Sequence, residues 1–226
     1  MIGGLSVLAL ITARGGSKGL PGKNVRLAAG RPLLAYTADA ARASRHVDRL
    51  VLSTDDEEIM RVGRETGCEV PFRRPAALAG DEATSIDVVL HALDTLPRHD
   101  LVLLLQPTSP LRTAADIDAA CELLLRHEAP ACVSLMPVPH HPQWMFGLDD
   151  GVHLAPLLRG TVAAARRQEL PPVYALNGAI YLARADWLRR TRTFLSEQTV
   201  GYVMPAGRSI DIDTLADFEA FSRLVS

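Results

Sequence analysis

The stretch from residue 13 to residue 24, ARGGSKGLPGKN, combines four glycines with three cations and contains no acidic residue. Glycines let the backbone bend sharply and bring its N–H groups close to phosphate oxygens. Arg14, Lys18 and Lys23 can add charge-assisted hydrogen bonds to the same oxygens. These residue types and their spacing predict a phosphate-binding turn.

The positive charge is local, because the chain of 226 residues has a net charge of -2. Such a chain has no long-range field that would hold nucleic acid or an anionic membrane, so we expect neither as a partner. Arg26 and Arg31 extend the run of cations, and all five precede the first acidic residue, Asp39. A solvated basic face is the alternative interpretation, but the glycine spacing argues against it.

Two familiar phosphate-binding motifs do not fit this turn. A Walker A loop would need glycine where Ser17 stands and a serine or threonine where Asn24 stands. No three of the glycines match G-x-G-x-x-G. The sequence therefore disfavours a P-loop ATPase and a dinucleotide-binding protein of the Rossmann type.

A second candidate site is the late segment SIDID, residues 209–213. If it is a strand, its period of two places Asp211 and Asp213 on one face and the two isoleucines on the other. Magnesium prefers a few carboxylates together with phosphate oxygens and water. The pair predicts a Mg²⁺ site, with the acidic outer face of an edge strand as the alternative.

The elements that must position these residues follow from hydrophobic periodicity. Nearly continuous apolar runs predict buried strands at 5–11, 48–54, 100–106 and 131–136. Helical spacing lies between and after them, at 31–44, 55–67, 84–93 and 113–128. This alternation predicts an α/β fold, a mostly parallel sheet with flanking helices. The glycine-rich turn then follows the first strand, where such sheets bind ligands.

Helix starts are predicted from acidic residues three positions after a capping residue. The pattern occurs at Asp55, Thr84, Thr113 and Thr214, and Gly67 can end the second helix. After residue 172 the pattern returns to a strand and a helix, then to a strand, a second short strand over SIDID and a last helix.

Residues 137–172 interrupt the alternation and are rich in proline and histidine. We interpret them as an inserted element that projects from the sheet, with a hairpin as one possible form. Trp144, Met145 and Phe146 form an apolar cluster there, which predicts contact between two copies of the chain. The length and the hydrophobic content of 48% otherwise suit one domain over 1–226.

Cellular location is expected to be the cytoplasm. The three cysteines form no C-x-x-C pair, which suits a reducing compartment. The apolar run 7–11 is too short for a membrane helix, and positive charges follow it instead of preceding it as in a signal peptide.

Taken together, the motifs resemble the acylneuraminate cytidylyltransferases, the CMP-sialic acid synthetase family. The signature A-R-G-G-S-K-G-x-P-G-K-N carries the resemblance most strongly. The related Kdo cytidylyltransferases share the late P-G-K but have proline where this chain has Asn24. Further segments match family counterparts in the same order, namely STDDEEI, RRPAALAGDEATS, LLLQPTSPLR, RRQELP, NGAIYL and SIDIDT.

This resemblance implies a nucleotide-diphosphosugar transferase-like (Rossmann-like) fold that dimerises through a projecting element. It implies transfer of CMP from CTP to the anomeric hydroxyl of a nonulosonic acid, with release of pyrophosphate. The acceptor is left open between sialic-like acids and others, namely Kdo, legionaminic acid, pseudaminic acid or a phosphonate. A nucleotide-binding module without catalysis is the alternative of another class.

The resemblance also implies roles for individual residues. The implied catalytic residues are Arg14, Lys18, Lys23 and Asp211, with Asp211 and Asp213 as the Mg²⁺ ligands. The implied nucleotide-binding residues are Ala13, Arg14, Gly15, Lys23, Asn24, Arg74, Ala83 and Ser85. The implied acceptor-binding residues are Gln106, Arg167, Tyr181 and Phe194.

The acceptor residues each have a structural alternative. Gln106 could satisfy a backbone group at a strand end, Tyr181 could be core packing, and Arg167 could be a solvated charge. An arginine is the expected partner of the acceptor carboxylate, because its planar fork binds a carboxylate through two hydrogen bonds.

Overall fold

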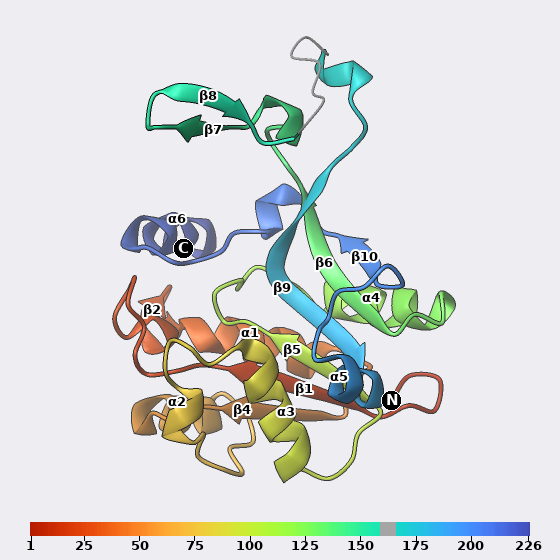
Figure 1. The fold of residues 1–226 in the computed structure, drawn as a ribbon. Coiled ribbons are helices and arrows are strands. Elements are labelled where there is room, and N and C mark those ends of the chain that lie inside the picture. The colour runs from red at the N-terminus through yellow and green to blue at the C-terminus, as the bar shows by residue number, and fades with distance from the viewer. Residues whose placement is uncertain (159–165) are drawn as a thin grey trace.

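A six-stranded sheet forms the centre of the molecule (Figure 1). The computed structural model describes residues 1–158 and 166–226, without the side chain of Arg167. The strand order is β10-β6-β9-β5-β1-β4; β9 is antiparallel to both neighbours and the other pairs are parallel. The mostly parallel sheet is therefore confirmed. The strands are β1 (Val7–Thr12), β4 (Arg49–Ser53), β5 (Leu101–Leu105), β6 (Ala131–Pro137), β9 (Tyr174–Arg184) and β10 (Val200–Val203).

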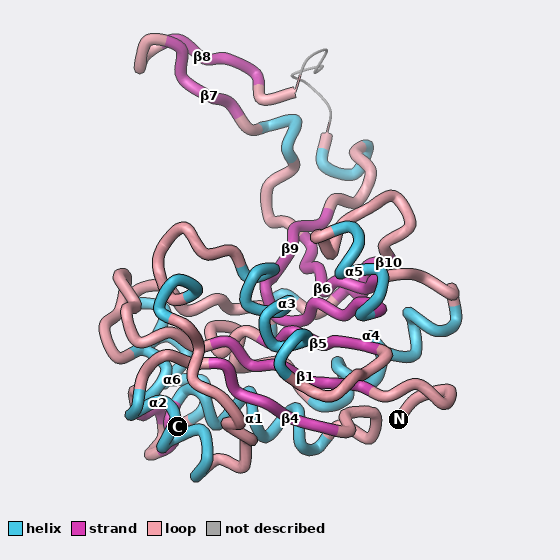
Figure 2. Tube along the Cα trace, turned by 60° about the horizontal axis from the view of Figure 1, so that its bottom comes forward, coloured by secondary structure: helices cyan, strands magenta, loops and turns pink. Residues whose placement is uncertain are grey.

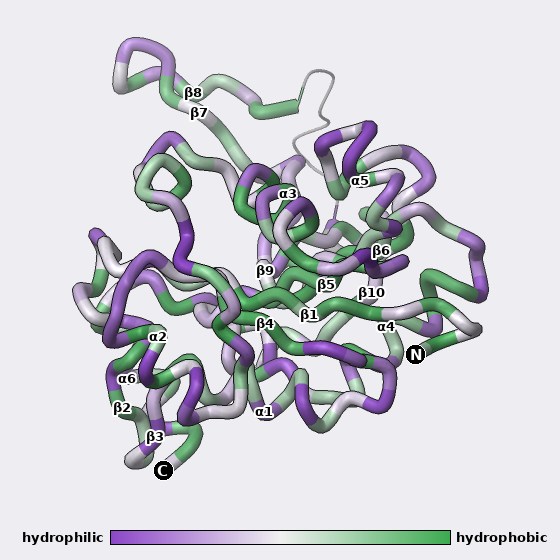
Figure 3. Tube along the Cα trace, turned by 90° about the horizontal axis from the view of Figure 1, so that it is seen from below, coloured by the Kyte–Doolittle hydropathy of each residue, from purple (hydrophilic) through white to green (hydrophobic). Residues whose placement is uncertain are grey.

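Helices cover both faces of the sheet (Figure 2). Along β1, Val7, Ala9 and Ile11 belong to one apolar cluster, whereas Leu8 and Leu10 belong to the other. The first cluster includes residues of α1, α2 and α4, and the second includes residues of α3 and α5. Figure 3 shows these central strands as hydrophobic. The helices are α1 (Leu33–Ala43), α2 (Glu57–Glu65), α3 (Ser85–Thr95), α4 (Ala114–Arg126), α5 (Ala185–Thr191) and α6 (Leu215–Val225).

Three of the four predicted capping boxes are present, at Thr84, Thr113 and Thr214. The prediction at Asp55 is wrong. Helix α2 begins one residue later than that prediction requires, and Asp56 is its N-cap, accepting a hydrogen bond of 2.9 Å from the N–H of Ile59. Gly67, at φ 84°, follows the end of α2 as expected.

The predicted second strand over residues 209–213 does not form, because no neighbouring strand pairs with this segment. A hydrogen bond of 2.8 Å from the N–H of Ile212 to the carbonyl of Thr108 holds it instead. The alternation nevertheless persists: Ile212 is buried in a third apolar cluster under α6, whereas Asp211 and Asp213 face solvent.

A hairpin projects from the ends of β6 and β9 (Figure 1). Its strands are β7 (Phe146–Asp149) and β8 (His153–Pro156), so the expected hairpin is present within 137–172. Whether this element mediates dimerisation stays a prediction, and residues 159–165 lie outside the described residues. Across 1–158 and 166–226, no helix has both the length and the apolar character that a membrane span needs.

The remaining elements are short. Strands β2 (Leu27–Ala28) and β3 (Arg31–Pro32) form a second small hairpin after the glycine-rich turn. Single turns of 3-10 helix are η1 (Lys23–Val25), η2 (Ala76–Leu78), η3 (Pro142–Trp144), η4 (Arg167–Glu169) and η5 (Ala206–Arg208).

Candidate active site

The glycine-rich turn leaves β1 at the carboxyl edge of the sheet and packs directly against the late acidic segment. Gly19 makes this approach possible, because a Cβ at this position would lie only 2.4 Å from the carbonyl oxygen of Asp213. Gly22, at φ 66°, adopts a left-handed conformation that favours glycine and starts η1. Two segments almost 200 residues apart therefore meet at one edge of the sheet.

Lys23 joins the two segments. Its Nζ donates to the carbonyl of Ile212 at 2.7 Å and lies 3.1 Å from Oδ1 of Asp213. The side chain is only 12% exposed, so these contacts hold the ammonium group in place. Asn24 is buried beside it and donates to the carbonyl of Arg14 at 3.2 Å. The predicted Lys23, Asn24 and Arg14 thus form one connected group.

A cavity of about 290 Å³ opens above this group, and we call it the nucleotide pocket. Most of the residues implied for nucleotide binding line it, together with Gln106. They are Arg14, Lys23, Asn24, Arg74, Ala83 and Ser85.

Gly15 and Ala13 lie in the same turn but do not line the nucleotide pocket. Gly15 donates its N–H to Asp55 at 3.2 Å, and a Cβ there would stand 2.8 Å from a carboxylate oxygen of Asp56. Ala13 is buried and donates its N–H to the carbonyl of Ser53 at 3.1 Å. Both residues therefore connect the turn to the end of β4.

Arg74 forms part of the pocket wall as a buried cation. It is 5% exposed, and its Nε donates to Oγ of Ser53 at 3.1 Å. Burial lowers the pKa of the guanidinium to about 10, and the charge of Asp55 opposes this shift. The group stays charged at neutral pH and is held in one orientation.

Asp81 is a functional candidate that the sequence did not single out. Its carboxylate lies 3.0 Å from Nη2 of Arg14 and 2.5 Å from Nζ of Lys18. The contact with Lys18, helped by Arg14, holds the pKa of Asp81 below its usual range. Lys18 is exposed and does not line the nucleotide pocket, so Asp81 connects it to Arg14. The only sequence signal was an acid in the segment AGDEATS, next to the implied Ala83.

The two late aspartates are close enough to interact. Part of Asp211 is open to solvent, yet surrounding protein atoms raise the pKa of its carboxyl, and the charge of Asp213 raises it further. A hydrogen bond from Thr108 and the charge of Lys23 oppose the rise. Among the described residues, no cluster of three or more His, Cys, Asp or Glu side chains could hold a metal ion. A cation at this pair would need further oxygens from phosphate or water.

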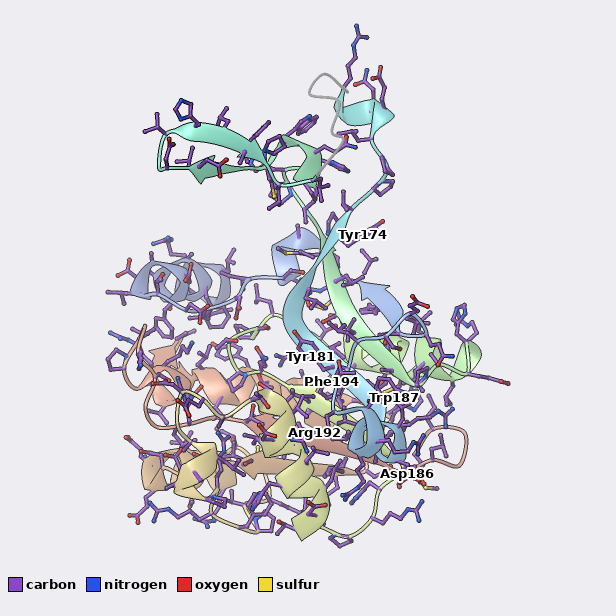
Figure 4. The ribbon with its side chains drawn as sticks, viewed as in Figure 1. Tyr174, Tyr181, Asp186, Trp187, Arg192 and Phe194 are labelled. Carbon is purple, nitrogen blue, oxygen red and sulfur yellow. The ribbon has the colours of Figure 1, made fainter. Side chains whose placement is uncertain are left out.

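A second cavity, of about 280 Å³, shares Ser85 and Gln106 with the nucleotide pocket, and we call it the acceptor cavity. Tyr181 and Phe194 line it, with their ring centroids 5.5 Å apart. Figure 4 shows these two side chains and Arg192 close together between β9 and α3. Three of the four implied acceptor residues, Gln106, Tyr181 and Phe194, are thus brought together.

Gly178 connects the acceptor cavity to the acidic pair. At φ 74°, it is a left-handed residue in β9, where the pairing with β6 is irregular. A Cβ there would lie 3.2 Å from Oε1 of Gln106 and 4.0 Å from Oδ2 of Asp211. Gln106 itself is fixed through its carbonyl, which accepts a hydrogen bond from the buried Arg112.

Arg167 is the implied acceptor residue that the structure does not place at either cavity. It begins η4, and its side chain lies outside the described part of the chain. In Figure 1 this turn lies near the projecting hairpin, away from the sheet. Its role stays a prediction.

Comparison with known proteins shows which family the chain belongs to. A family model described as cytidylyltransferase matches residues 8–195. CMP-N,N'-diacetyllegionaminic acid synthase of Legionella pneumophila is 37% identical over 227 residues, covering 98% of this chain and 97% of that protein. N-acylneuraminate cytidylyltransferase of Streptococcus agalactiae is 36% identical over 93% of this chain, which spans about half (51%) of that longer relative.

Other relatives and solved structures extend the comparison. Pseudaminic acid cytidylyltransferase of Campylobacter jejuni is 32% identical, covering 94% of this chain and 93% of that protein. The structure of CMP:2-keto-3-deoxy-manno-octonic acid synthetase complexed with CTP shares the fold, with a TM-score of 0.75, 17% identity and coverage of 97% and 98% of the two chains. The match of the family model and the identity to full-length relatives show that this chain belongs to the cytidylyltransferase family that includes the acylneuraminate cytidylyltransferases.

Proposed function

We propose that this protein transfers CMP from CTP to the anomeric hydroxyl of a nonulosonic acid and releases pyrophosphate. One observation carries the proposal: Lys23 ties the glycine-rich turn to the late acidic pair beside a pocket that joins a second, less polar cavity. A triphosphate in the first cavity and a sugar acid in the second would meet at Ser85 and Gln106. The relatives named for CMP-sugar synthesis support this assignment.

The chemistry is an in-line displacement at the α-phosphorus. A bond forms from the acceptor oxygen to phosphorus, and the bond from that phosphorus to the bridging oxygen of pyrophosphate breaks. Arg14 and Lys23 would neutralise phosphate oxygens, and Lys18 would assist the departing pyrophosphate. Positioning of the reactants alone can remove up to about 7–11 kcal/mol from such a barrier. The fixed contacts of Lys23 and Arg74 support this use of preorganised charge.

Asp211 and Asp213 fit Mg²⁺, because two mutually repelling carboxylates offer the hard oxygen ligands that it prefers. When bound, Mg²⁺ would supply neutralisation of phosphate charge. Asp211 lies near Gln106 across Gly178, so its carboxylate is also our candidate to accept the hydroxyl proton.

A second copy of the chain is the proposed partner of the projecting hairpin. Large apolar side chains are exposed along it, which is costly in a monomer. We expect the protein to sediment as a dimer at micromolar concentration. A monomer at that concentration would contradict the proposal. The exposed hairpin residues include Phe146, Leu148, Val152, Leu154 and Leu157.

We also propose that the protein lies in the cytoplasm. Its three cysteines are buried and unpaired, which supports a reducing compartment.

The test is pyrophosphate release from CTP in the presence of a panel of sugar acids. We expect release only when both a nonulosonic acid and Mg²⁺ are present. A panel with Kdo and a phosphonate separates the alternative acceptors. CTP binding without turnover for every acid would instead favour the nucleotide-binding module.

A further inference from the structure

Four buried polar side chains lie around the irregular part of β9, outside both cavities. Ser109, Ser134, Asn177 and Ser209 are between 0% and 6% exposed. None of the four lines the nucleotide pocket or the acceptor cavity, so none is placed to contact a bound ligand. Burial of a polar side chain costs free energy unless the protein replaces its hydrogen bonds to water. Here the hydrogen bonds of the three serines converge on Asn177.

Asn177 uses both ends of its side-chain amide and its backbone carbonyl. Its Oδ1 accepts hydrogen bonds from Oγ of Ser134 at 2.5 Å and from the N–H of Ala179 at 3.2 Å. Its Nδ2 donates to Oγ of Ser209 at 2.9 Å, and its carbonyl accepts from Oγ of Ser109 at 3.3 Å. A buried network whose members are all satisfied holds its parts in one arrangement. Asn177 therefore connects β9 to β6, to the loop after β5 and to the segment that carries the acidic pair.

The regular pairing of β6 with β9 is interrupted at this network. The register shifts between Val133 and Leu135, and Ser134 between them accepts a hydrogen bond of 2.8 Å from the N–H of Ile180. A side-chain hydroxyl thus bonds to the backbone of β9 where the ladder changes register. Irregularities of this kind bend a strand and change where its residues point. Gly178, at φ 74°, lies in this stretch.

Gly178 is the point at which the irregular stretch meets the candidate active site. A Cβ on this residue would lie 3.2 Å from Oε1 of Gln106 and 4.0 Å from Oδ2 of Asp211. The backbone of β9 therefore comes between the residue that both cavities share and the acidic residue proposed as the proton acceptor. Where the irregular stretch lies affects the space between these two side chains.

The acidic segment itself is anchored on both sides of Asp211. On one side, the N–H of Ile212 donates to the carbonyl of Thr108 at 2.8 Å. On the other side, Ser209 is hydrogen-bonded to Asn177 at 2.9 Å. Asn177 is thus attached both to the strand that passes Gln106 and to the segment that carries the aspartates.

We propose that the buried network of Ser134, Asn177 and Ser209 positions Asp211 relative to Gln106 for the reaction, without contacting either substrate. This inference rests on the proposed function and adds positioning residues to it. The acceptor hydroxyl must lie within hydrogen-bond reach of its proton acceptor while the sugar acid occupies the acceptor cavity. A misplacement of about 1 Å in such an arrangement can cost on the order of 10²-fold in rate. A network that served only the stability of the core would leave the rate of the folded protein unchanged.

Ser209→Ala tests the proposal with the smallest change, because it removes one hydroxyl and leaves the aspartates in place. The full chain is assayed for pyrophosphate release with CTP, Mg²⁺ and the sugar acid that gives the fastest turnover. We expect kcat to fall by roughly 10–100-fold, the range for loss of a group that orients a residue of the site. The KM for CTP should stay unchanged, because the network does not line the nucleotide pocket.

Ser44→Ala is the matched control. Ser44 is 7% exposed, its Oγ donates to Oδ1 of Asp118 at 2.6 Å, and it lines neither cavity. This variant also removes a buried hydroxyl with a hydrogen bond, so it should lower the melting temperature but keep the wild-type kcat. If Ser209→Ala is folded and keeps the same kcat as Ser44→Ala, the positioning role is wrong. A loss in Ser209→Ala that appears only as a higher KM for CTP also contradicts it.

A double-mutant cycle tests whether the two serines act through Asn177. Ser134→Ala should lower kcat as Ser209→Ala does, and it serves as the second variant if Ser209→Ala does not fold. The two hydroxyls bond to opposite ends of one amide, so their effects on kcat should be coupled. The double variant should therefore lose less activity than the product of the two single losses. Independent, multiplicative losses overturn the network.

The outcomes also separate this inference from the function on which it rests. Absence of turnover by the wild-type protein with every sugar acid overturns the proposed function. Turnover by the wild type, with unchanged kcat in folded Ser134→Ala and Ser209→Ala, overturns the positioning role alone.

Discussion

The nucleotide pocket and the acceptor cavity share two residues but differ in how their side chains are held. In the nucleotide pocket, the cations Lys23 and Arg74 are largely buried and have oxygen partners from distant segments. In the acceptor cavity, Leu176 and Leu195 are half exposed. Phosphate charge is stabilised best by hydrogen-bond donors that are already oriented before the ligand binds. Apolar contacts tolerate ligands and side chains of somewhat different shape. Under the proposed function, triphosphate chemistry would constrain the nucleotide pocket and acceptor choice would constrain the acceptor cavity.

The largest expected effect is on Lys23, the residue that joins the turn to the acidic pair. Lys23→Ala should lower kcat/KM for pyrophosphate release by on the order of 10²–10³-fold, because a preorganised cation is lost. The melting temperature should show that the variant is folded. Arg26→Ala, which removes a cation that lines neither cavity, should keep most of the activity. Unchanged turnover in Lys23→Ala would remove this residue from the mechanism.

Next in size is the acidic pair. Asp211→Asn should lower turnover by on the order of 10²-fold, because it removes a proposed Mg²⁺ ligand and proton acceptor. CTP binding should persist when measured by calorimetry. Chelation of Mg²⁺ should abolish turnover of the wild type. If Asp211→Asn keeps the wild-type rate and Mg²⁺ dependence, the metal assignment is wrong.

Gly19→Ala tests the contact between the turn and the acidic segment without removing a charge. Its Cβ would meet the carbonyl of Asp213 at 2.4 Å, so the backbone must shift. We expect a loss of roughly 1–3 kcal/mol of stability and a clear rise in the KM for CTP. Gly16→Ala is the matched control, because apart from its two neighbours in the chain no residue lies within 4 Å of its added Cβ. Equal CTP kinetics in the two variants would show that the contact is dispensable.

The smallest expected effect concerns Asp81. Its carboxylate pairs with two cations proposed for the triphosphate, so Asp81→Asn should lower the KM for CTP by roughly twofold to fivefold, as expected for exposed ion pairs. Glu82→Gln removes a neighbouring negative charge and serves as the control. A higher KM for CTP in Asp81→Asn would show that Asp81 assists nucleotide binding instead of competing with it.

Most elements of the fold could be predicted because their signals are local. Buried parallel strands appear as continuous apolar runs, as at Val7–Thr12 and Leu101–Leu105. Capping boxes appear as fixed spacings, as at Thr84 and Thr113. The spacing failed at Asp55, because Asp56 next to it also carries a capping carboxylate and the helix begins after Asp56.

By itself, the sequence determined which residues could handle phosphate, since glycine spacing and charge in the turn are properties of consecutive residues. It also determined that Asp211 and Asp213 face away from Ile212. The side chains alternate along this segment although it does not pair as a strand. Only the tertiary structure decided that Lys23 contacts this segment, that Asp81 lies between Arg14 and Lys18, and that leucines from β9 and from the segment after α5 form one wall. Those contacts join residues far apart in the chain, and their geometry depends on how the sheet and its loops pack.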